Sequence, residues 1–314
     1  MAAPANLTTK SQFSTTIREV DFVTQFQKNW DALRTIMGIM RPIRKAPGTK
    51  LVSYKATVDG GLQGGTTVAE GDDIPLTKTK VEPVAYGDIE IGKWAKAVTI
   101  EAVAAYGAEV AVERTDTAFR NELQKKVLTD FYTFLKTGKL VGTQKTWQRA
   151  LAIAKGAVLK RFANDNLDVT EVVGFANIMD FYDWLGDKEI TVQTQFGLTY
   201  VKDFLGYSTL FLLPDNYIAQ KQVIAIPREN ICLYYVDPAD SDFAKLGLNY
   251  TVAGETNLIG YHAEGNYKNA TGETYAIMGM KLWAEYLDGI AVVTVGASNT
   301  EPAVAVEASE STGK

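Results

Sequence analysis

The spacing of hydrophobic residues predicts a series of amphipathic helices. The predicted helices lie at 20–37, 109–136, 146–163 and 178–185. The longest of them has an apolar stripe of residues four positions apart: Phe119, Leu123, Val127 and Phe131. At about 1.5 Å per residue this helix is roughly 40 Å long, a length that suits a strut. The last of the four is predicted to begin at Asn177, whose side chain can cap it.

Alternation of apolar and polar positions predicts strands in the rest of the chain. The predicted strands lie at 52–58, 86–99, 172–175, 200–213, 222–226 and 256–295. Within the last of these runs, Ala270-Thr271-Gly272 and Asp288-Gly289 are predicted as hairpin turns. Residues 146–251 therefore resemble a compact α/β unit. A final tail, 297–314, is predicted to have weak structure of its own.

Residues 51–98 are predicted to form one long hairpin arm, with 86–99 as its returning strand. The tip holds four residues that cost entropy to order and have no side chains to pack, Gly60, Gly61, Gly64 and Gly65. We expect little apolar content in the arm, and such a hairpin is marginally stable alone in water. The tip is therefore mobile or held by something else, and the stabiliser we expect is a surface of another subunit.

Charge is distributed unevenly along the 314 residues, whose formal net charge is −5. Residues 1–50 contain eight Lys or Arg and three Asp or Glu, so they carry +5 and the remainder carries −10. A basic arm on an acidic body indicates an anionic partner, either nucleic acid or the acidic body of a neighbouring copy. A solvated arm without a partner is the alternative. The arm has no dense Lys/Arg block with interleaved aromatic residues, so specific base recognition is not expected.

The sequence offers little for catalysis, metal binding or membrane insertion. The chain has one cysteine, Cys232, in an apolar run where a buried structural role is expected, and one histidine, His262, expected to be packed or at the surface. These exclude an internal disulfide and a histidine-rich metal site. No apolar run approaches the roughly 20 residues that span a bilayer, and the N-terminus does not resemble a signal peptide. We therefore expect a protein of the cytoplasm, without cofactor or metal.

Two short motifs have a stronger structural than chemical interpretation. Gly87–Lys93 fits seven positions of a phosphate-binding loop, but the eighth is Trp94 instead of Ser or Thr, and acidic residues in the segment would repel phosphate. The acidic group Glu70, Asp72 and Asp73 could hold a hard cation, although its spacing does not match an EF-hand. A solvated acidic turn and a salt contact with a neighbour's basic arm are the alternatives.

The order of these segments, together with four local stretches, resembles the major capsid proteins of tailed bacteriophages. The stretches are Val98–Tyr106 before the long helix, Gln195–Tyr200 before Phe204-Leu205-Gly206, Val223–Asn230, and Leu287–Val292. The resemblance covers nearly the whole chain and implies the α+β Hong Kong 97-type capsid fold. It implies the following regions: an N-terminal arm 1–50, an extended loop 51–98, a peripheral domain 99–145 and 252–296 with a spine helix 109–136, an axial domain 146–251 and a C-terminal tail 297–314.

The resemblance also implies a structural, non-enzymatic function. Members of the family assemble as hexamers and pentamers into an icosahedral shell around double-stranded DNA, so this chain is expected in a virion assembled in a bacterial cytoplasm. The implied partners are copies of itself, scaffolding and portal proteins, decoration proteins as a further candidate, and DNA held by non-specific contact, with no membrane. The chain lacks a long, charged, coiled N-terminal region, which implies a separate scaffolding protein or a trimmed sequence. An encapsulin-type nanocompartment and an enzyme with an unrecognised carboxylate site are the competing hypotheses.

The candidate inter-subunit residues belong to the predicted hairpin and to the basic N-terminal arm. They are Gly60, Gly61, Gly64, Gly65, Glu70, Asp72, Asp73, Lys78, Lys80, Arg41, Arg44 and Lys45. In a shell, we expect the hairpin to act as a clasp on the adjacent subunit. The long helix is expected to pack its apolar stripe against the strands at 256–295.

Overall fold

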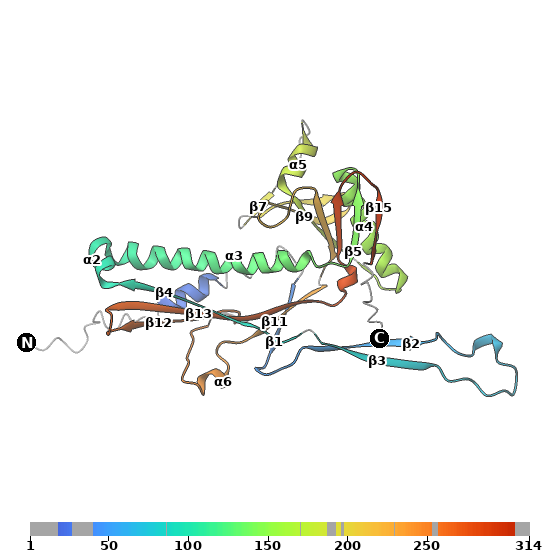
Figure 1. Ribbon diagram of the computed structural model, residues 1–314, viewed down its shortest axis with the longest axis horizontal. Coiled ribbons are helices and arrows are strands. Elements are labelled where there is room, and N and C mark those ends of the chain that lie inside the picture. Colours follow the sequence, from blue (N-terminus) through green and yellow to red (C-terminus); the bar gives the residue numbers. More distant parts are fainter. Residues whose placement is uncertain are drawn as a thin grey trace, which may run out of the picture.

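A long helix lies along a five-stranded sheet, and an eight-stranded sheet stands at the C-terminal end of that helix (Figure 1). A separate two-stranded arm projects beyond these two sheets, away from the body (Figure 1). The computed structural model describes residues 18–26, 40–85, 87–169, 171–186, 193–195, 198–228, 230–252 and 257–304. No helix in these ranges is long and apolar enough to cross a membrane.

The elements follow one another in mixed order. The strands are β1 Met40–Lys45, β2 Val52–Asp59, β3 Lys78–Ala85, β4 Ile91–Thr99, β5 Leu140–Gln144, β6 Val172–Asn177, β7 Gln193–Gln195, β8 Leu198–Phe204, β9 Tyr207–Leu213, β10 Gln222–Pro227, β11 Ile231–Val236, β12 Gly260–Asn266, β13 Thr271–Ala284, β14 Ala291–Val295 and β15 Thr300–Val304. The helices are α2 Ile100–Ala108, α3 Thr115–Leu135, α4 Trp147–Asn164, α5 Ile178–Leu185 and α6 Ser241–Ala244. Shorter helical turns are η2 Gly65–Thr67 and η4 Leu287–Gly289, and η3 Glu109–Arg114 is a π-helix.

The predicted helix 109–136 is divided in the structure. Its first six residues form η3, and the regular part, α3, begins at Thr115. Gly107 has a φ of 79°, a left-handed value that glycine tolerates, and it kinks α2 just before its end at Ala108. Helices α4 and α5 agree with prediction, and the Asn177 side chain accepts a hydrogen bond of 2.8 Å from the Met179 amide as the predicted cap.

The five-stranded sheet contains β1, β11, β13, β12 and β4, all of which except β1 pair antiparallel. Strand β1, which pairs parallel with β11, was missed because Pro42 was interpreted as part of a turn. The sheet tolerates this proline because β1 is an edge strand. The prediction that Tyr86–Thr99 returns along the hairpin is wrong. Its regular part, β4, pairs with β13 in register from Thr99↔Thr271 to Ile91↔Gly279, and Tyr86 lies outside the described residues.

The arm itself is made by β2 and β3, paired antiparallel from Val52↔Ala85 to Asp59↔Lys78. These two strands form a sheet of their own. The returning strand was missed because Lys78–Ala85 contains two lysines, a glutamate and a proline, which hide its alternation. The arm is therefore shorter than predicted, and it is independent of the strand that follows it.

The eight-stranded sheet has the order β15-β5-β14-β10-β6-β9-β8-β7. Helices α4 and α5 cover one face, and the other face meets the end of α3. The sheets do not follow the expected sequence blocks: β11 lies in the five-stranded sheet, whereas β14 lies in the eight-stranded one. The residues Asp288-Gly289 belong to η4, which links the two sheets and is not a hairpin turn, and the β12–β13 turn at 267–270 comes earlier than predicted. The tail also contains an unexpected strand, β15, paired with β5, whereas 305–314 lies outside the described residues.

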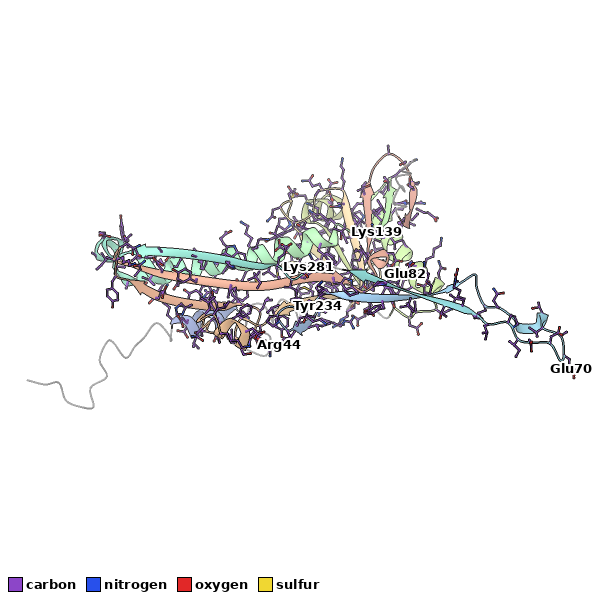
Figure 2. The ribbon with its side chains drawn as sticks, turned by 60° about the horizontal axis from the view of Figure 1, so that its bottom comes forward. Arg44, Glu70, Glu82, Lys139, Tyr234 and Lys281 are labelled. Atoms are coloured by element: carbon purple, nitrogen blue, oxygen red, sulfur yellow. The ribbon has the colours of Figure 1, made fainter. Side chains whose placement is uncertain are left out.

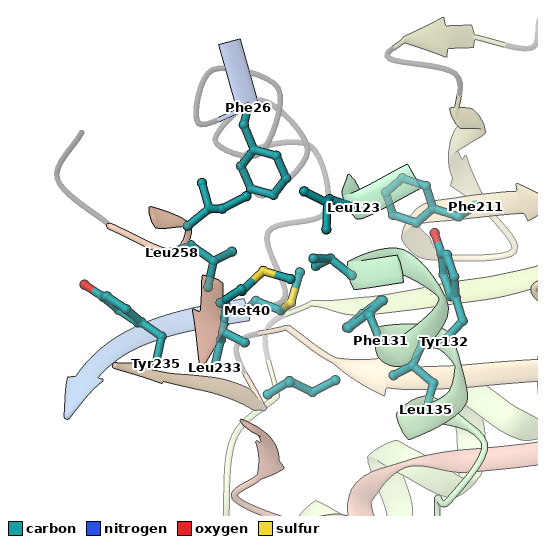
Figure 3. Packing of buried hydrophobic residues seen from close by; sticks show 14 of the residues in the cluster. Phe26, Met40, Leu123, Phe131, Tyr132, Leu135, Phe211, Leu233, Tyr235 and Leu258 are labelled. Atoms are coloured by element: carbon teal, nitrogen blue, oxygen red, sulfur yellow. The ribbon is translucent and has the colours of Figure 1, made fainter. Parts of the chain in front are cut away.

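One hydrophobic core joins α3 to both sheets (Figure 3). Leu123, Val127 and Phe131 of the predicted stripe are buried in it with Ala276 and Met278 of β13, and Phe119 is partly buried against it. This confirms the expected packing of the stripe. At the end of α3, Phe131 and Tyr132 contact Phe175 of β6 edge-on, with ring centroids 6.2 and 5.9 Å apart.

Residues 18–26 are helical and form part of this core. Phe22 stacks on Tyr261 with ring centroids 4.0 Å apart, and Val23 and Phe26 are fully buried. The predicted helix at 20–37 is confirmed for residues 20–26, and this segment and β1 pack on the body instead of forming a solvated arm. Other parts of the predicted arm and helix, 1–17 and 27–39, lie outside the described residues.

Candidate inter-subunit surface

The projecting arm has an exposed apolar face that the sequence interpretation missed. The β2–β3 register places the following side chains on one face: Val52, Tyr54, Ala56, Val58, Thr79, Val81 and Pro83. All of them are exposed, and Tyr54 and Val81 retain 71% and 58% of their accessible surface. The arm was expected to be poor in apolar residues because β3 was not recognised, so half of this face was invisible. An apolar face left in water on a two-stranded ribbon indicates a surface awaiting a partner.

The opposite face of the arm is charged. Lys78 and Lys80 lie there and pair within the arm, Lys78 with Asp59 at 3.1 Å and Lys80 with Glu82. Both ion pairs are well exposed to solvent, so they contribute little to stability. The two candidate lysines are therefore on the arm, as expected, but they face away from its apolar side.

The tip of the arm has a defined local geometry. Gly60, Gly61, Gly64 and Gly65 have φ values of 77°, 76°, 92° and 84°, which side chains with a Cβ rarely adopt. The Gln63 amide donates to Thr77 Oγ1 at 3.1 Å, and the Gln63 side chain donates to the Gly60 carbonyl at 3.1 Å. These bonds lie within the tip, and the positive φ values show that the glycines serve its turn geometry.

Acidic and apolar side chains surround this turn. Glu70, Asp72 and Asp73 are exposed, and no ion pair involving them occurs among the described residues. The same described residues contain no group of three His, Cys, Asp or Glu that could hold a metal. Leu76 and Leu62 project nearby, with Leu76 93% exposed. The tip is therefore an acidic surface with apolar side chains in between.

The three candidate cations of β1 lie on the body, far from the tip; Figure 2 shows Arg44 there and Glu70 at the arm's end. Arg41 pairs with Glu285, and Arg44 lies 3.3 Å from Asp237 and 3.4 Å from Asp240. Lys45 Nζ lies 4.7 Å from the centre of the Tyr234 ring. The candidate residues thus form two groups, and the β1 group already has partners within its own chain.

A buried ionic cluster fixes the helix at 18–26 to the body. Asp116 of α3 accepts hydrogen bonds from Arg18 and from the Tyr261 hydroxyl, the latter at 3.2 Å, and lies 2.5 Å from Lys96 Nζ of β4. Burial opposes ionisation of Asp116, but the hydrogen bonds from Arg18 and Lys96 prevail and lower the pKa of its carboxyl. The cluster is therefore structural: its acid stays charged and each of its groups has a partner.

Another apolar surface lies at the opposite end of α3 from the eight-stranded sheet. A cavity of about 400 Å³ opens there between the start of α2 and the β12–β13 turn, lined by Val98, Ile100 and Val103 among others. Tyr267 beside it is 99% exposed. Sequence patterns did not predict this surface, because its lining residues come from four separate parts of the chain, at 18, 98–103, 112 and 265–272.

Comparison with known proteins finds likeness in structure and not in sequence. No family model matches the chain, and no curated protein matches it. A structure of Mycobacterium phage Patience superposes with a TM-score of 0.54 at 10% identity, over 93% of this chain and 91% of that chain. The mature capsid of bacteriophage PhiM1 gives 0.52 at 8% identity, over 82% and 86%. The SrpI encapsulin of Synechococcus elongatus PCC 7942, in its holo complex, gives 0.50 at 12% identity, over 92% of both chains. The predicted α+β Hong Kong 97-type fold is thereby confirmed.

Proposed function

We propose that this chain is a shell-forming structural protein, the major capsid protein of a tailed bacteriophage. Its copies would assemble as hexamers and pentamers into an icosahedral shell that encloses double-stranded DNA, and its place would be the virion. The fold, shared over most of the chain with phage capsids, supports this proposal. The proposed role is structural, because shell formation needs complementary surfaces and no reacting group.

The observation that carries the proposal is the projecting arm. Tyr54 and Val81 stay in water on a ribbon outside the core of the monomer. Burying such side chains would contribute about 1.5–3 kcal/mol each, and the monomer does not gain this free energy. A subunit of a shell can gain it, because a neighbouring copy would cover both side chains. The tip residues Glu70, Asp72 and Asp73 would then meet the same neighbour.

The regions of the fold suit this assignment. We assign α3 with the five-stranded sheet to the peripheral domain and the eight-stranded sheet with α4 and α5 to the axial domain. The arm of β2 and β3 corresponds to the extended loop. The N-terminal region 1–50 and the tail 297–314 keep their proposed assignments, with 18–26, β1 and β15 packed on the body. Scaffolding, portal and decoration proteins are the further partners of this proposal, together with DNA bound without sequence specificity.

The test is to express the chain and examine the purified product by electron microscopy. Closed shells or rings of five and six copies are the expected result, and a stable monomer at high concentration would overturn the proposal. Particles from the native source should contain nuclease-protected double-stranded DNA, detected by absorbance and by extraction.

An encapsulin-type nanocompartment is the second candidate, favoured by the match to the SrpI encapsulin over 92% of this chain. The same particles distinguish the two. Shells filled with a co-purifying protein and free of DNA would replace the phage assignment with this one, while the shell-forming role would stand.

A further inference from the structure

The segment from the end of α3 to the end of α4 carries only positive charge. Residues 131–164 contain seven Lys or Arg and no Asp or Glu, in a chain whose formal net charge is −5. The seven are Lys136, Lys139, Lys145, Arg149, Lys155, Lys160 and Arg161. Like charges gathered in one region repel one another, and an anionic partner relieves that repulsion. Five of the seven lie in α4 or just before it, so the positive charge is concentrated at this helix.

The fold places much of this charge on the solvent side of α4, which lies along the eight-stranded sheet (Figure 1). The core side of the helix is formed by three fully buried residues, Leu151, Ala154 and Val158. Arg149 and Lys160 are separated by about three helical turns, so they lie on one side, roughly 16 Å apart along the axis. Both are exposed, as is Lys145 just before the helix. We call Lys145, Arg149 and Lys160 the basic row.

Acidic side chains do little to neutralise the basic row. Within the described part of the chain, neither Lys145 nor Arg149 takes part in an ion pair, and the Arg149 Nε donates to the neutral Gln144 Oε1 at 2.9 Å. Lys160 lies 3.9 Å from Glu301, but 72% and 83% of these two side chains are exposed, so the pair is weak. The positive charge of the row is therefore available to an external partner.

A glycine lies between the two cations of α4 on the solvent side of the helix. Gly156 is helical, and glycine inside a helix costs stability relative to alanine. Packing does not require it, because a Cβ at this position would meet no heavy atom of the described residues within 4 Å. Ala152, one turn earlier, is also exposed. Small residues at the centre of the row let the backbone of a partner come close to the helix.

We propose that the basic row is where the shell contacts its enclosed double-stranded DNA, through the phosphates. The inference rests on the proposed function, because it assigns a site to the DNA that the shell would hold. Lys and Arg contacts to phosphate position DNA without reading its sequence. An acidic protein also carries the required charge, but protein interfaces centre on large aromatic or apolar anchors, and the centre of this row is Ala152 and Gly156.

DNA binding by the full chain in its unassembled form tests the contact. The probe is a fluorescent 30-base-pair duplex of mixed sequence, followed by anisotropy at several salt concentrations. The triple variant Lys145→Gln/Arg149→Gln/Lys160→Gln should bind it at least tenfold more weakly at about 50 mM salt. The slope of log K against log salt should fall by about 3, since each lost phosphate contact removes about 0.9. Circular dichroism checks that the variant is folded.

The matched control is Arg114→Gln/Lys125→Gln/Lys126→Gln, which removes the same number of exposed cations from η3 and α3. Two of these lysines have acidic neighbours on α3, Glu122 and Asp130. The control should lose less than threefold in affinity and keep the wild-type salt slope. An equal loss in the two triple variants, or none in the variant of the basic row, overturns the proposal.

Gly156→Leu keeps every charge and should weaken binding at least threefold, because the added side chain holds the phosphates away from the helix. Unchanged binding would show that the DNA does not approach α4. Poly-glutamate is the competing probe, and if it binds as tightly as the duplex, the row is a site for an acidic protein and the assignment to DNA is overturned.

In DNA-filled particles, formaldehyde should link Lys145 and Lys160 to DNA, as mapped by mass spectrometry. Links to other lysines alone would show that α4 faces away from the DNA, and would overturn the proposal while the shell function stands. If the wild-type chain forms no shells in the micrographs, the proposed function fails, and with it the role of the basic row inside a shell.

Discussion

At the scale of single residues, the Asp116 cluster links the N-terminal helix to α3 and β4. Arg18, Lys96 and Asp116 are mostly buried, with 29%, 15% and 10% of their side-chain surfaces exposed. Removing one member leaves the others with charges that the surroundings do not compensate, which costs more than the loss of a surface ion pair. The cluster is thus stable only when every charge is paired, and it is most sensitive to the loss of Asp116, which pairs with both Arg18 and Lys96.

We expect Asp116→Asn to reduce the free energy of unfolding of the unassembled chain by about 1–3 kcal/mol near neutral pH. Because the folded pKa of Asp116 lies below its ordinary value of about 4, its contribution is complete above that pH and is lost as the pH falls through the folded pKa. The difference between variant and wild type should therefore shrink in acid. Urea unfolding at several pH values measures it.

Asp130→Asn is the control, because among the described residues Asp130 pairs with exposed Lys126 alone, four positions away on the same helix. It should cost about 0.3–0.5 kcal/mol. An equal loss in the two variants, or a loss at Asp116 that persists in strong acid, would contradict the structural role of the cluster.

At the scale of elements, the arm separates folding from assembly. Since Tyr54 and Val81 contact no core, the double change Tyr54→Ser/Val81→Ser should alter the free energy of unfolding by no more than about 0.5 kcal/mol per site. Under the proposed function it should nevertheless abolish shells, because a neighbouring copy would bury this apolar face. Denaturant unfolding and sedimentation measure the two effects, and Glu82→Ser on the opposite face should retain assembly. Normal shells from the double variant would refute a role for this face.

The tip makes a separate prediction. Replacing Gly60–Asp73 by a short Gly-Ser linker leaves β2 and β3 intact and removes Glu70, Asp72 and the glycine turn. The body should stay folded by circular dichroism, and closed shells should become fewer or disappear in sedimentation. Loss of the fold would show that the tip supports the core, and an undiminished yield of shells would show that it is not part of the clasp.

Local patterns predicted elements well wherever the element carries its own signal. The stripe of α3, the Thr146–Trp147 start of α4 and the Asn177 cap are all readable over a few residues. Pairing between strands cannot be read from a few residues. The partner of β4 is β13, more than a hundred residues away, and periodicity does not say which strands pair. Strand β1 was not predicted because it contains Pro42, which a strand tolerates at the edge of a sheet.

The sequence predicted the position of the arm but not its apolar face. Glycines and charges at 60–80 marked the arm, since composition alone reveals a segment with few large side chains to pack. Its apolar face needed the β2–β3 register, which pairs Ala56 with Val81. The role of β1 cations between subunits stays a prediction, and their contacts with Glu285, Asp237 and Tyr234 compete with it.

At the scale of the whole molecule, the chain passes between the two large sheets three times, from β4 to β5, from β10 to β11 and from β13 to β14. The core under α3 also contains residues of both sheets, such as Phe211 and Leu233 (Figure 3). We therefore expect the unassembled chain to unfold as one cooperative unit, with a single calorimetric transition. Two resolved transitions would show that the sheets are independent.

The docking of residues 18–26 has a consequence for synthesis. Glu19 accepts a hydrogen bond from the Ala263 amide, 244 residues later in the chain, and another of 2.6 Å from the Thr251 hydroxyl. During synthesis on the ribosome, the helix at 18–26 therefore cannot dock on its partners until nearly the whole polypeptide has emerged. If the chain forms shells as proposed, a nascent copy cannot take its place in a shell before its own translation is almost complete, because its body is completed last.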